Sequence, residues 1–168
     1  PGWRIAINVS VRQLEQVGFA RHVLAAVAAA GWPPERLELE VTESIPLFES
    51  ATVSANRDLL VAAGVRFAID DFGTGYASFG RIDRHAFGHV KVDRSLVARA
   101  DDEDGRALLR AIRALTGQLG TETTAEGVET PAQLAILVED GWDVAQGYLL
   151  GRPTPDAALR DLLRRVPE

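Results

Sequence analysis

Two hydrophobic patterns alternate along the whole chain. Short runs rich in β-branched residues predict strands, and longer runs with apolar residues at every third or fourth position predict helices. The predicted strands are residues 4–10, 36–42, 65–71, 88–93, 121–126 and 143–149. The predicted helices are 14–30, 49–63, 101–119, 130–140 and a last one from 154 onward, with a short helix at 79–84. Strands that alternate with helices are typical of a parallel sheet built by right-handed crossovers.

Start and stop signals support these boundaries. Ser10 with Gln13 forms a capping-box pattern, and Thr130 followed by Pro131 is a common helix start. Gly31 ends the first long helical run. No linker or low-complexity tract divides the chain, so its 168 residues are predicted to form one domain.

A polar residue recurs near the C-terminal end of every predicted strand, where a buried strand would favour apolar ones. These residues are Asn8, Glu40, Asp70 with Asp71, Lys91 with Asp93, Glu126 and Gln146. They recur about every 28 residues, and eight such units would need roughly 220 residues, close to a (β/α)8 barrel. The chain is therefore expected to hold about six units. An open sheet binds ligands at one switch point, so six polar strand ends favour the barrel, whose strands all end at one mouth.

Carboxylates gathered at one mouth would repel one another, because only Lys91 opposes them. Crowded like charges raise each other's pKa and destabilise the fold, and bound divalent cations relieve the repulsion. Carboxylate and amide oxygens favour Mg²⁺ or Mn²⁺ over zinc or copper. Asp70 and Asp71 point to opposite sides of a regular strand, so we expect the strand to end there if both reach a metal. Two metals about 4 Å apart would clamp a phosphodiester during attack by water.

Several of these residues also have a purely structural explanation. An Asp-Asp pair before a glycine turn is commonly a turn or a cap. Glu40 could lie on the solvated face of a strand that also carries Glu38, and Lys91 could extend to solvent. His85 lies before the fourth predicted strand and His89 at its start, at the end opposite the mouth, so we expect both at the surface.

Composition narrows the chemistry further. The chain has no cysteine, which excludes disulfides, zinc–thiolate sites, iron–sulfur clusters and thiol nucleophiles. A net charge of −6 argues against a nucleic-acid polymer as partner. No apolar run approaches the roughly 20 residues of a spanning helix, and no signal peptide begins the sequence. We therefore expect no membrane contact by this segment and a cytoplasmic location.

Six motifs, taken in order, resemble those of EAL domains, which are bacterial phosphodiesterases that hydrolyse cyclic di-GMP to linear pGpG. The motifs are AINVS (6–10), LELEVTES (37–44), AIDDFGTGYASF (68–79), VKVD (90–93), AEGVET (125–130) and QGYLLGRP (146–153). The resemblance covers essentially the whole chain, and DDFGTGY together with AEGVET is highly specific. It implies an α/β fold of the TIM-barrel type and a requirement for Mg²⁺ or Mn²⁺, as two ions.

The resemblance also implies which residues bind the metals. Asn8, Glu40 and Asp70 match the ligands of a first metal ion. Asp71 and Asp93 match positions tied to a second ion.

Further roles in catalysis and regulation follow from the same resemblance. Lys91 matches a lysine that contacts the attacking water and the phosphate, Glu126 matches a carboxylate that acts as metal ligand or general base, and Gln146 matches a further active-site residue. The segment that couples dimerisation to metal binding in the family matches Glu129 and a loop that includes Phe72, Gly73, Thr74 and Gly75. Glycines in this loop are free to adopt a positive φ.

The EAL tripeptide itself is absent from the sequence, and Thr123 and Thr124 stand where apolar residues are usual. In the family the tripeptide lies on an early strand, where its Glu binds the first metal and a nearby Arg contacts substrate. Residues 1–168 are therefore expected to be the C-terminal two-thirds of an EAL domain, truncated at its N-terminal side. Such a barrel leaves sheet edges open. A homodimer or another segment is expected to complete it, with flanking sensory or GGDEF-type domains in the full gene.

Three functions remain open at this point. The first is metal-dependent hydrolysis of cyclic di-GMP. The second is a non-catalytic cyclic di-GMP receptor or regulatory domain that lacks turnover because the upstream Glu is missing. The third is a different Mg²⁺-dependent barrel enzyme that uses Lys91 as a base beside a metal-bound enolate.

Overall fold

A computed structural model describes residues 3–42, 50–73 and 87–163 of the chain. The short helix predicted at 79–84, the loop residues Thr74 and Gly75, and His85 lie outside the described residues. Among the described residues, no helix is both long enough and apolar enough to cross a membrane.

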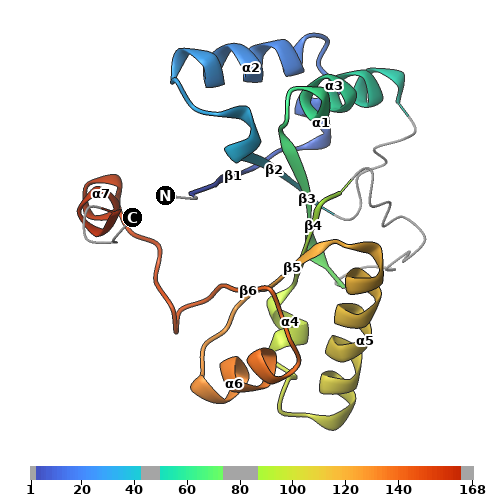
Figure 1. The fold of residues 1–168 in the computed structure, drawn as a ribbon, viewed down its shortest axis with the longest axis vertical. Coiled ribbons are helices and arrows are strands. Elements are labelled where there is room, and N and C mark those ends of the chain that lie inside the picture. The colour runs from blue at the N-terminus through green and yellow to red at the C-terminus, as the bar shows by residue number, and fades with distance from the viewer. Residues whose placement is uncertain (1–2, 43–49, 74–86, 164–168) are drawn as a thin grey trace.

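Six parallel strands form one sheet in the order in which they occur in the chain. They are β1 (Ile5–Asn8), β2 (Leu37–Thr42), β3 (Arg66–Phe72), β4 (His89–Val92), β5 (Glu122–Ala125) and β6 (Val144–Ala145). The sheet curls into a half-barrel whose concave face opens toward the two chain ends (Figure 1). The predicted incomplete barrel of six βα units is confirmed. The last strand is shorter than the predicted 143–149.

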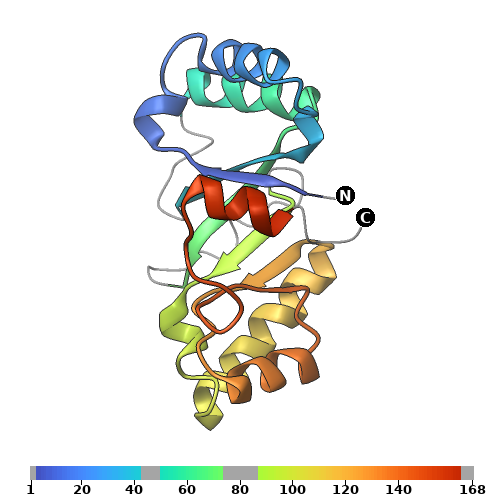
Figure 2. The same ribbon diagram turned by 90° about the vertical axis from the view of Figure 1, so that its left-hand side faces the viewer.

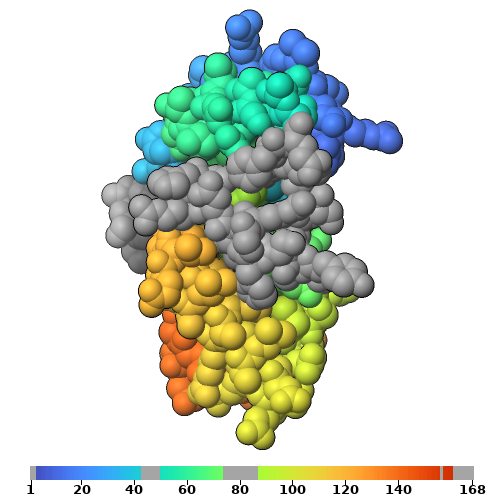
Figure 3. Space-filling model, turned by 90° about the vertical axis from the view of Figure 1, so that its right-hand side faces the viewer, coloured from blue at the N-terminus to red at the C-terminus, as the bar shows by residue number. Residues whose placement is uncertain are grey.

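Helices cover the convex face of the sheet in two groups (Figure 1). The helices of the first three strands are α1 (Val11–Leu14), α2 (Phe19–Ala29) and α3 (Ala51–Ala62), and a 3₁₀ turn at Pro34–Arg36 precedes β2. The second group comprises α4 (Arg94–Val97), α5 (Glu103–Leu119) and α6 (Pro131–Glu139). The space-filling view separates the two groups by colour (Figure 3). A last helix, α7 (Asp156–Leu163), stands apart from the sheet in Figure 1 and overlaps it only in the view of Figure 2.

The single helix predicted at 14–30 is wrong, because the chain forms α1 and α2 with a break at Gly18. Gly18 has a φ of +86°, a left-handed conformation that glycine adopts without strain. The buried amide of Asn56 stabilises the break from α3. Its Nδ2 donates to the carbonyl of Leu14 at 2.8 Å and to that of Gln16 at 2.9 Å, and its Oδ1 accepts from the Ala20 N–H at 3.2 Å.

The predicted capping box at Ser10 and the predicted helix start at Thr130 are both confirmed. The Ser10 hydroxyl accepts from the Gln13 N–H, and the Gln13 side chain accepts from the Ser10 N–H. Thr130 and Gln133 make the same exchange at the start of α6, with Pro131 in the first turn. These bonds satisfy amide groups that have no partner within the helix.

The two faces of the sheet differ in chemistry. Apolar side chains of the convex face pack against the helices and form the main core, which includes Leu39, Val41, Phe67, Ile69 and Val90 together with Leu60, Leu109 and Ile112. The alternate positions of the same strands face the concave side. Those positions carry mostly charged and polar residues, so the inside of the half-barrel is polar.

Candidate active site

The structure places the predicted polar residues at the C-terminal ends of the strands. Asn8 ends β1, Glu40 lies in β2, and Asp70 and Asp71 lie near the end of β3. The remaining residues lie in β4 or directly after β4, β5 and β6, namely Lys91, Asp93, Glu126 and Gln146. Because all six strands are parallel, these residues line one edge of the sheet, which we call the mouth.

A β-bulge lets both members of the Asp70–Asp71 pair face the concave side. Ile69 pairs with Val90, and Phe72 pairs with Val92, so Asp70 and Asp71 together oppose one residue of β4. Asp71 has a φ of +54°, which is uncommon for any residue but glycine. As expected, the strand ends beside this pair, at Phe72. The sequence did not predict the bulge, whose extra residue changes the alternation of faces.

Lys91 is the only lysine of the chain, and it binds three carboxylates at the mouth. Its Nζ lies 2.9 Å from Glu40 Oε1, 2.9 Å from Asp70 Oδ1 and 2.6 Å from Glu126 Oε1. The side chain is 7% exposed, so the interpretation that Lys91 extends to solvent is wrong. Glu40 is also buried, so it does not lie on a solvated face. The partners come from β2, β3 and the end of β5, which Lys91 therefore ties together.

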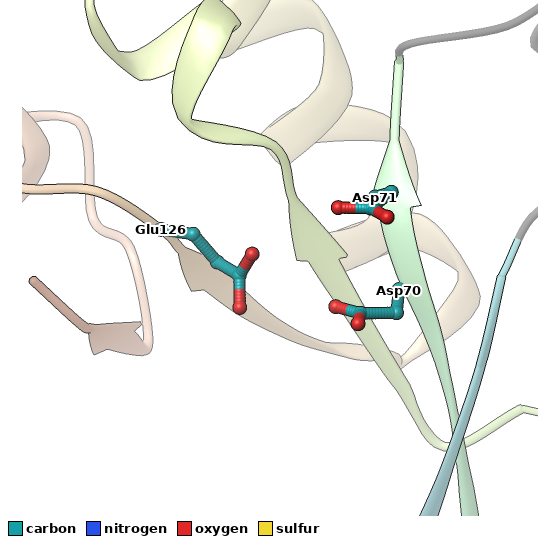
Figure 4. Close-up of side chains that lie close together, drawn as sticks. All are labelled: Asp70, Asp71 and Glu126. Carbon is teal, nitrogen blue, oxygen red and sulfur yellow. The ribbon is translucent and has the colours of Figure 1, made fainter. Parts of the chain in front are cut away.

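Three carboxylates converge closely enough to share a metal ion. Asp70, Asp71 and Glu126 each offer an oxygen, and these oxygens lie within 4.8 Å of one another. The side chains of the two aspartates point from β3 toward Glu126, which follows β5, across the end of β4 (Figure 4). An all-oxygen group of this kind is suited to Mg²⁺ or Mn²⁺.

The titration of the mouth residues reflects this crowding. Burial and the charges of Asp70 and Asp93 raise the pKa of Asp71 above its ordinary value. Burial also raises the pKa of Glu126, and the hydrogen bond from Lys91 only partly offsets that effect. Burial alone would lower the pKa of Lys91, but its hydrogen bonds to the carboxylates outweigh burial and raise it. Lys91 is therefore a permanent cation in a group where the pKa values of Asp71 and Glu126 are raised.

A pocket of about 460 Å³ adjoins the three-carboxylate group. Asp71 and Glu126 line it together with Asp93, Glu129 and Gln146, and Arg94, Gly127, Gly147 and Tyr148 complete its wall. Asp93 caps α4, because its carboxylate accepts from the Ser95 N–H at 2.8 Å, and this bond helps to lower its pKa against the effect of burial. The pocket is open to solvent on one side of the mouth and has room for a ligand beside the acids.

Asn8 and Phe72 belong neither to the lining of this pocket nor to the group of carboxylates around Lys91. Asn8 pairs in register with Glu40 but is exposed at the free edge of β1. Phe72 is buried in the core of the convex face, while Gly73 follows it with a φ of +99°. The structure therefore brings Asp71, Asp93, Glu126, Glu129 and Gln146 together at one pocket and leaves Asn8 at the edge.

A second polar layer lies below the mouth, toward the N-terminal ends of the strands. His89 is 6% exposed, so its expected position at the surface is wrong. Its Nδ1 lies 2.8 Å from Glu38 Oε1, and its Nε2 lies 2.8 Å from Thr124 Oγ1. The period of two along β4 places His89 on the same face as Lys91, and this signal could have identified it. Thr124 also belongs to this layer, through the hydroxyl that bonds His89.

Arginines complete this lower layer. The Arg66 guanidinium lies 3.0 Å from Glu122 Oε2 and 3.9 Å from Glu38 Oε2, and Arg4 binds Glu122 at 2.8 Å. Burial alone would raise the pKa of Glu122, but the hydrogen bond and charge of Arg4 outweigh burial and lower it. The lower layer thus pairs its acids with cations.

Comparison with known proteins identifies relatives of the same architecture. The chain is 40% identical over 154 residues to MucR of Pseudomonas aeruginosa, a bifunctional diguanylate cyclase/cyclic di-GMP phosphodiesterase. That alignment covers 91% of this chain and 22% of MucR. The chain spans about a fifth of the length of the curated relatives that it matches.

Solved structures agree with the sequence comparison. The EAL domain of Mycobacterium smegmatis DcpA has a TM-score of 0.87 and 36% identity, over 98% of this chain and 75% of that one. Klebsiella pneumoniae BlrP1, determined as a complex with manganese and cyclic di-GMP, has a TM-score of 0.83 and 30% identity, over 89% of this chain and 39% of that one. The EAL domain family model matches residues 1–153. Over these residues the chain belongs to the EAL domain family.

Proposed function

We propose that this domain hydrolyses a phosphodiester bond of cyclic di-GMP to give linear pGpG, and that the reaction requires divalent metal ions. The observation that carries the proposal is the convergence of Asp70, Asp71 and Glu126 around Lys91 beside an open pocket. Relatives named as cyclic di-GMP phosphodiesterases support the choice of substrate. The structure of BlrP1 with manganese and cyclic di-GMP supports the requirement for metal.

The donor set at the mouth fits Mg²⁺ or Mn²⁺. Asp70 and Asp71 offer carboxylate oxygens on the same side of β3 because of the bulge, and Glu126 offers a third across β4. We assign Glu40, Asn8 and Asp93 as further ligands of two ions. When bound, such ions would lower the pKa of a coordinated water and neutralise charge on the phosphate. They would also relieve the repulsion among the carboxylates.

The protein's own residues then supply binding and proton transfer. Lys91 stays protonated, and its three N–H groups bond three carboxylates. Once those carboxylates bind metal, its ammonium would be released to donate to a phosphate oxygen and to orient the attacking water. Glu126 accepts the proton of that water, and its raised pKa brings its basicity closer to that of a general base suited to neutral pH. Gln146 also lines the pocket and offers an amide to orient the substrate.

Regulation and assembly extend the same proposal. Glu129 lies at the pocket, two residues before α6, and together with the loop of Phe72, Gly73, Thr74 and Gly75 it would couple formation of a homodimer to metal binding. We also propose that residues 1–168 are one part of an EAL-type phosphodiesterase domain, joined to sensory or GGDEF-type domains in a cytoplasmic protein. The name of MucR, a bifunctional relative, supports this arrangement.

The decisive test is turnover of cyclic di-GMP by the full-length protein with Mg²⁺ or Mn²⁺, read as linear pGpG by chromatography. We expect activity that chelation abolishes and that Lys91→Ala lowers by at least about 100-fold, as expected for a group that acts at the transition state. Arg110→Ala is a matched control, because Arg110 lies on α5 and binds Asp140 far from the mouth. Unchanged turnover in Lys91→Ala would contradict the assignment. Binding of cyclic di-GMP without turnover would favour a receptor instead.

A further inference from the structure

Two polar rungs of the same design cross the concave face of the half-barrel. The upper rung is Glu40 on β2, Lys91 on β4 and Glu126 after β5. The lower rung comprises the residues two positions earlier on each strand, namely Glu38, His89 and Thr124. Since side chains two residues apart share a face of a strand, the lower rung lies directly below the upper one.

The lower rung is short, buried and connected at both ends. The imidazole of His89 lies 2.8 Å from Glu38 and 2.8 Å from Thr124, and the three residues are 2–6% exposed. His89 reaches β2 across β3, where Ala68 is its register partner and also that of Glu40. The small side chain of Ala68 leaves space for the ring to pass.

The lower rung can act as a rigid spacer between β2 and β5. An imidazole ring has two nitrogens on opposite sides, and here each has a partner on a different strand, β2 or β5. These strands are not neighbours in the sheet, so no backbone ladder links them directly. A buried polar network with partners at both ends specifies one arrangement of its strands. The ring thus fixes the distance between β2 and β5 below the mouth.

The upper rung depends on that same distance. Lys91 must reach Glu40 and Glu126 at once, at 2.9 and 2.6 Å, from a flexible side chain. If β2 and β5 moved apart, Lys91 would lose one carboxylate. Glu126 would then leave the group that it forms with Asp70 and Asp71.

We infer that His89 is a positioning residue, which together with Glu38 and Thr124 sets the spacing of β2, β4 and β5 so that Lys91 and the metal-binding carboxylates meet. This inference rests on the proposed metal-dependent hydrolysis. It adds a function for three residues that touch neither the pocket nor the three-carboxylate group.

The test compares two threonines on one strand in the full-length protein. Thr124→Val removes the hydroxyl that bonds His89 and keeps the shape of the side chain. Thr123→Val is the matched control, because Thr123 is equally buried but its hydroxyl bonds Asp143 on the other face, at 2.9 Å. The measurements are Mn²⁺ affinity by calorimetry, kcat and KM for cyclic di-GMP, and the melting temperature in chelator.

We expect Thr124→Val to weaken Mn²⁺ binding and to lower kcat by about 10-fold or more, the usual effect of losing a residue that orients metal ligands. KM should change little, because the rung does not touch the pocket. Thr123→Val should keep wild-type metal affinity and kcat, although both variants lose one hydrogen bond. Thr124→Ser keeps the hydroxyl and should restore both values. His89→Leu should repeat the Thr124→Val effect, and His89→Gln should recover part of it.

The outcomes separate this inference from the proposed function. Failure of the wild-type protein to bind Mn²⁺ or to hydrolyse cyclic di-GMP would overturn the proposed function. Wild-type activity with equal loss, or no loss, in the two valine variants would overturn the inference alone. A lower melting temperature in Thr124→Val with unchanged metal affinity and kcat would show a merely structural rung and would also overturn it.

Discussion

Glu122 and Glu126 lie four residues apart, at the two ends of β5, and their environments shift their pKa values in opposite directions. Arg4 and Arg66 bind Glu122, and its pKa is lowered although burial acts to raise it. Glu126 shares one lysine with Glu40 and Asp70, and burial raises its pKa. The ionised form of a glutamate is thus stabilised in the lower layer and destabilised at the mouth.

The comparison extends to the two layers as wholes. The lower layer balances Glu38 and Glu122 with two arginines, and His89 adds a neutral or positive link. At the mouth, Glu40, Asp70 and Glu126 share the single ammonium of Lys91, so in the described part of the chain three acids bind one cation. A balanced layer stabilises the half-barrel, whereas an unbalanced one is stable only at a cost and is typical of a site that binds cations. The balance of charge within a layer, and not its burial, therefore distinguishes the structural lower layer from the proposed functional mouth.

The largest expected effect comes from removing the cation of each layer. Lys91→Met leaves Glu40, Asp70 and Glu126 without the cation that they share, so in chelator it should lower the free energy of unfolding by about 3 kcal/mol. Arg66→Met should cost only about 1 kcal/mol, because Glu122 keeps Arg4 and Glu38 keeps His89. Mn²⁺ should recover a large part of the loss in Lys91→Met, because the ion replaces the missing positive charge. It should recover nothing in Arg66→Met beyond its effect on the wild type. Urea unfolding with and without Mn²⁺ measures both.

Equal recovery in the two variants would mean that Mn²⁺ acts on the whole protein and not at the mouth. Arg57→Met provides a background value for loss of an arginine outside both layers, since Arg57 lies on α3 and binds its neighbour Asp58.

The next effect is the stabilisation that metal gives to the wild type. At a concentration 100 times its Kd, Mn²⁺ should raise the free energy of unfolding by about 2.7 kcal/mol, because it binds the folded state alone. Asp70→Asn should reduce this gain strongly, while Glu122→Gln should keep it. Thermal unfolding across a series of Mn²⁺ concentrations tests the expectation, and a gain that Asp70→Asn leaves intact would place the ion elsewhere.

Periodicity predicted most of the fold. Strand and helix patterns, the capping box at Ser10, the helix start at Thr130 and the recurring polar ends of the strands were sufficient to predict a curled parallel sheet with acids at one edge. The break at Gly18 was not predictable, because the buried amide of Asn56, about 40 residues further along the chain, stabilises it. Helical periodicity contains no signal for a partner that distant.

The site was predicted in composition but not in geometry. Two adjacent aspartates predicted the strand end but not the bulge and the left-handed Asp71, which pairing with β4 selects. His89 was expected at the surface because it starts its strand. It is buried because it faces the concave side of the sheet, where Glu38 and Thr124 bond both of its ring nitrogens.

The smallest predicted effect returns to the two glutamates of β5. In chelator at neutral pH, Glu122→Gln should lower the free energy of unfolding by about 1 kcal/mol, because it breaks partly exposed ion pairs. Glu126→Gln should raise it slightly, since it removes a charge from a crowded group. A folded-state pKa that is lowered contributes stability above the unfolded pKa, and that contribution is lost as pH falls through the folded value. Glu122 follows this rule.

Glu126 follows the opposite rule. Its raised pKa means that the folded state binds a proton at a higher pH than the unfolded state does, so its ionisation costs stability at neutral pH. This cost disappears as pH falls from neutral through the raised folded pKa to the unfolded value. The difference between wild type and Glu126→Gln should therefore shrink toward acid pH through that window, while the Glu122→Gln difference persists until lower pH. Urea unfolding from pH 7 to 4 measures both differences. If the two differences in unfolding free energy changed with pH in the same way, the two ends of β5 would share one environment. Charge balance would then not distinguish the layers.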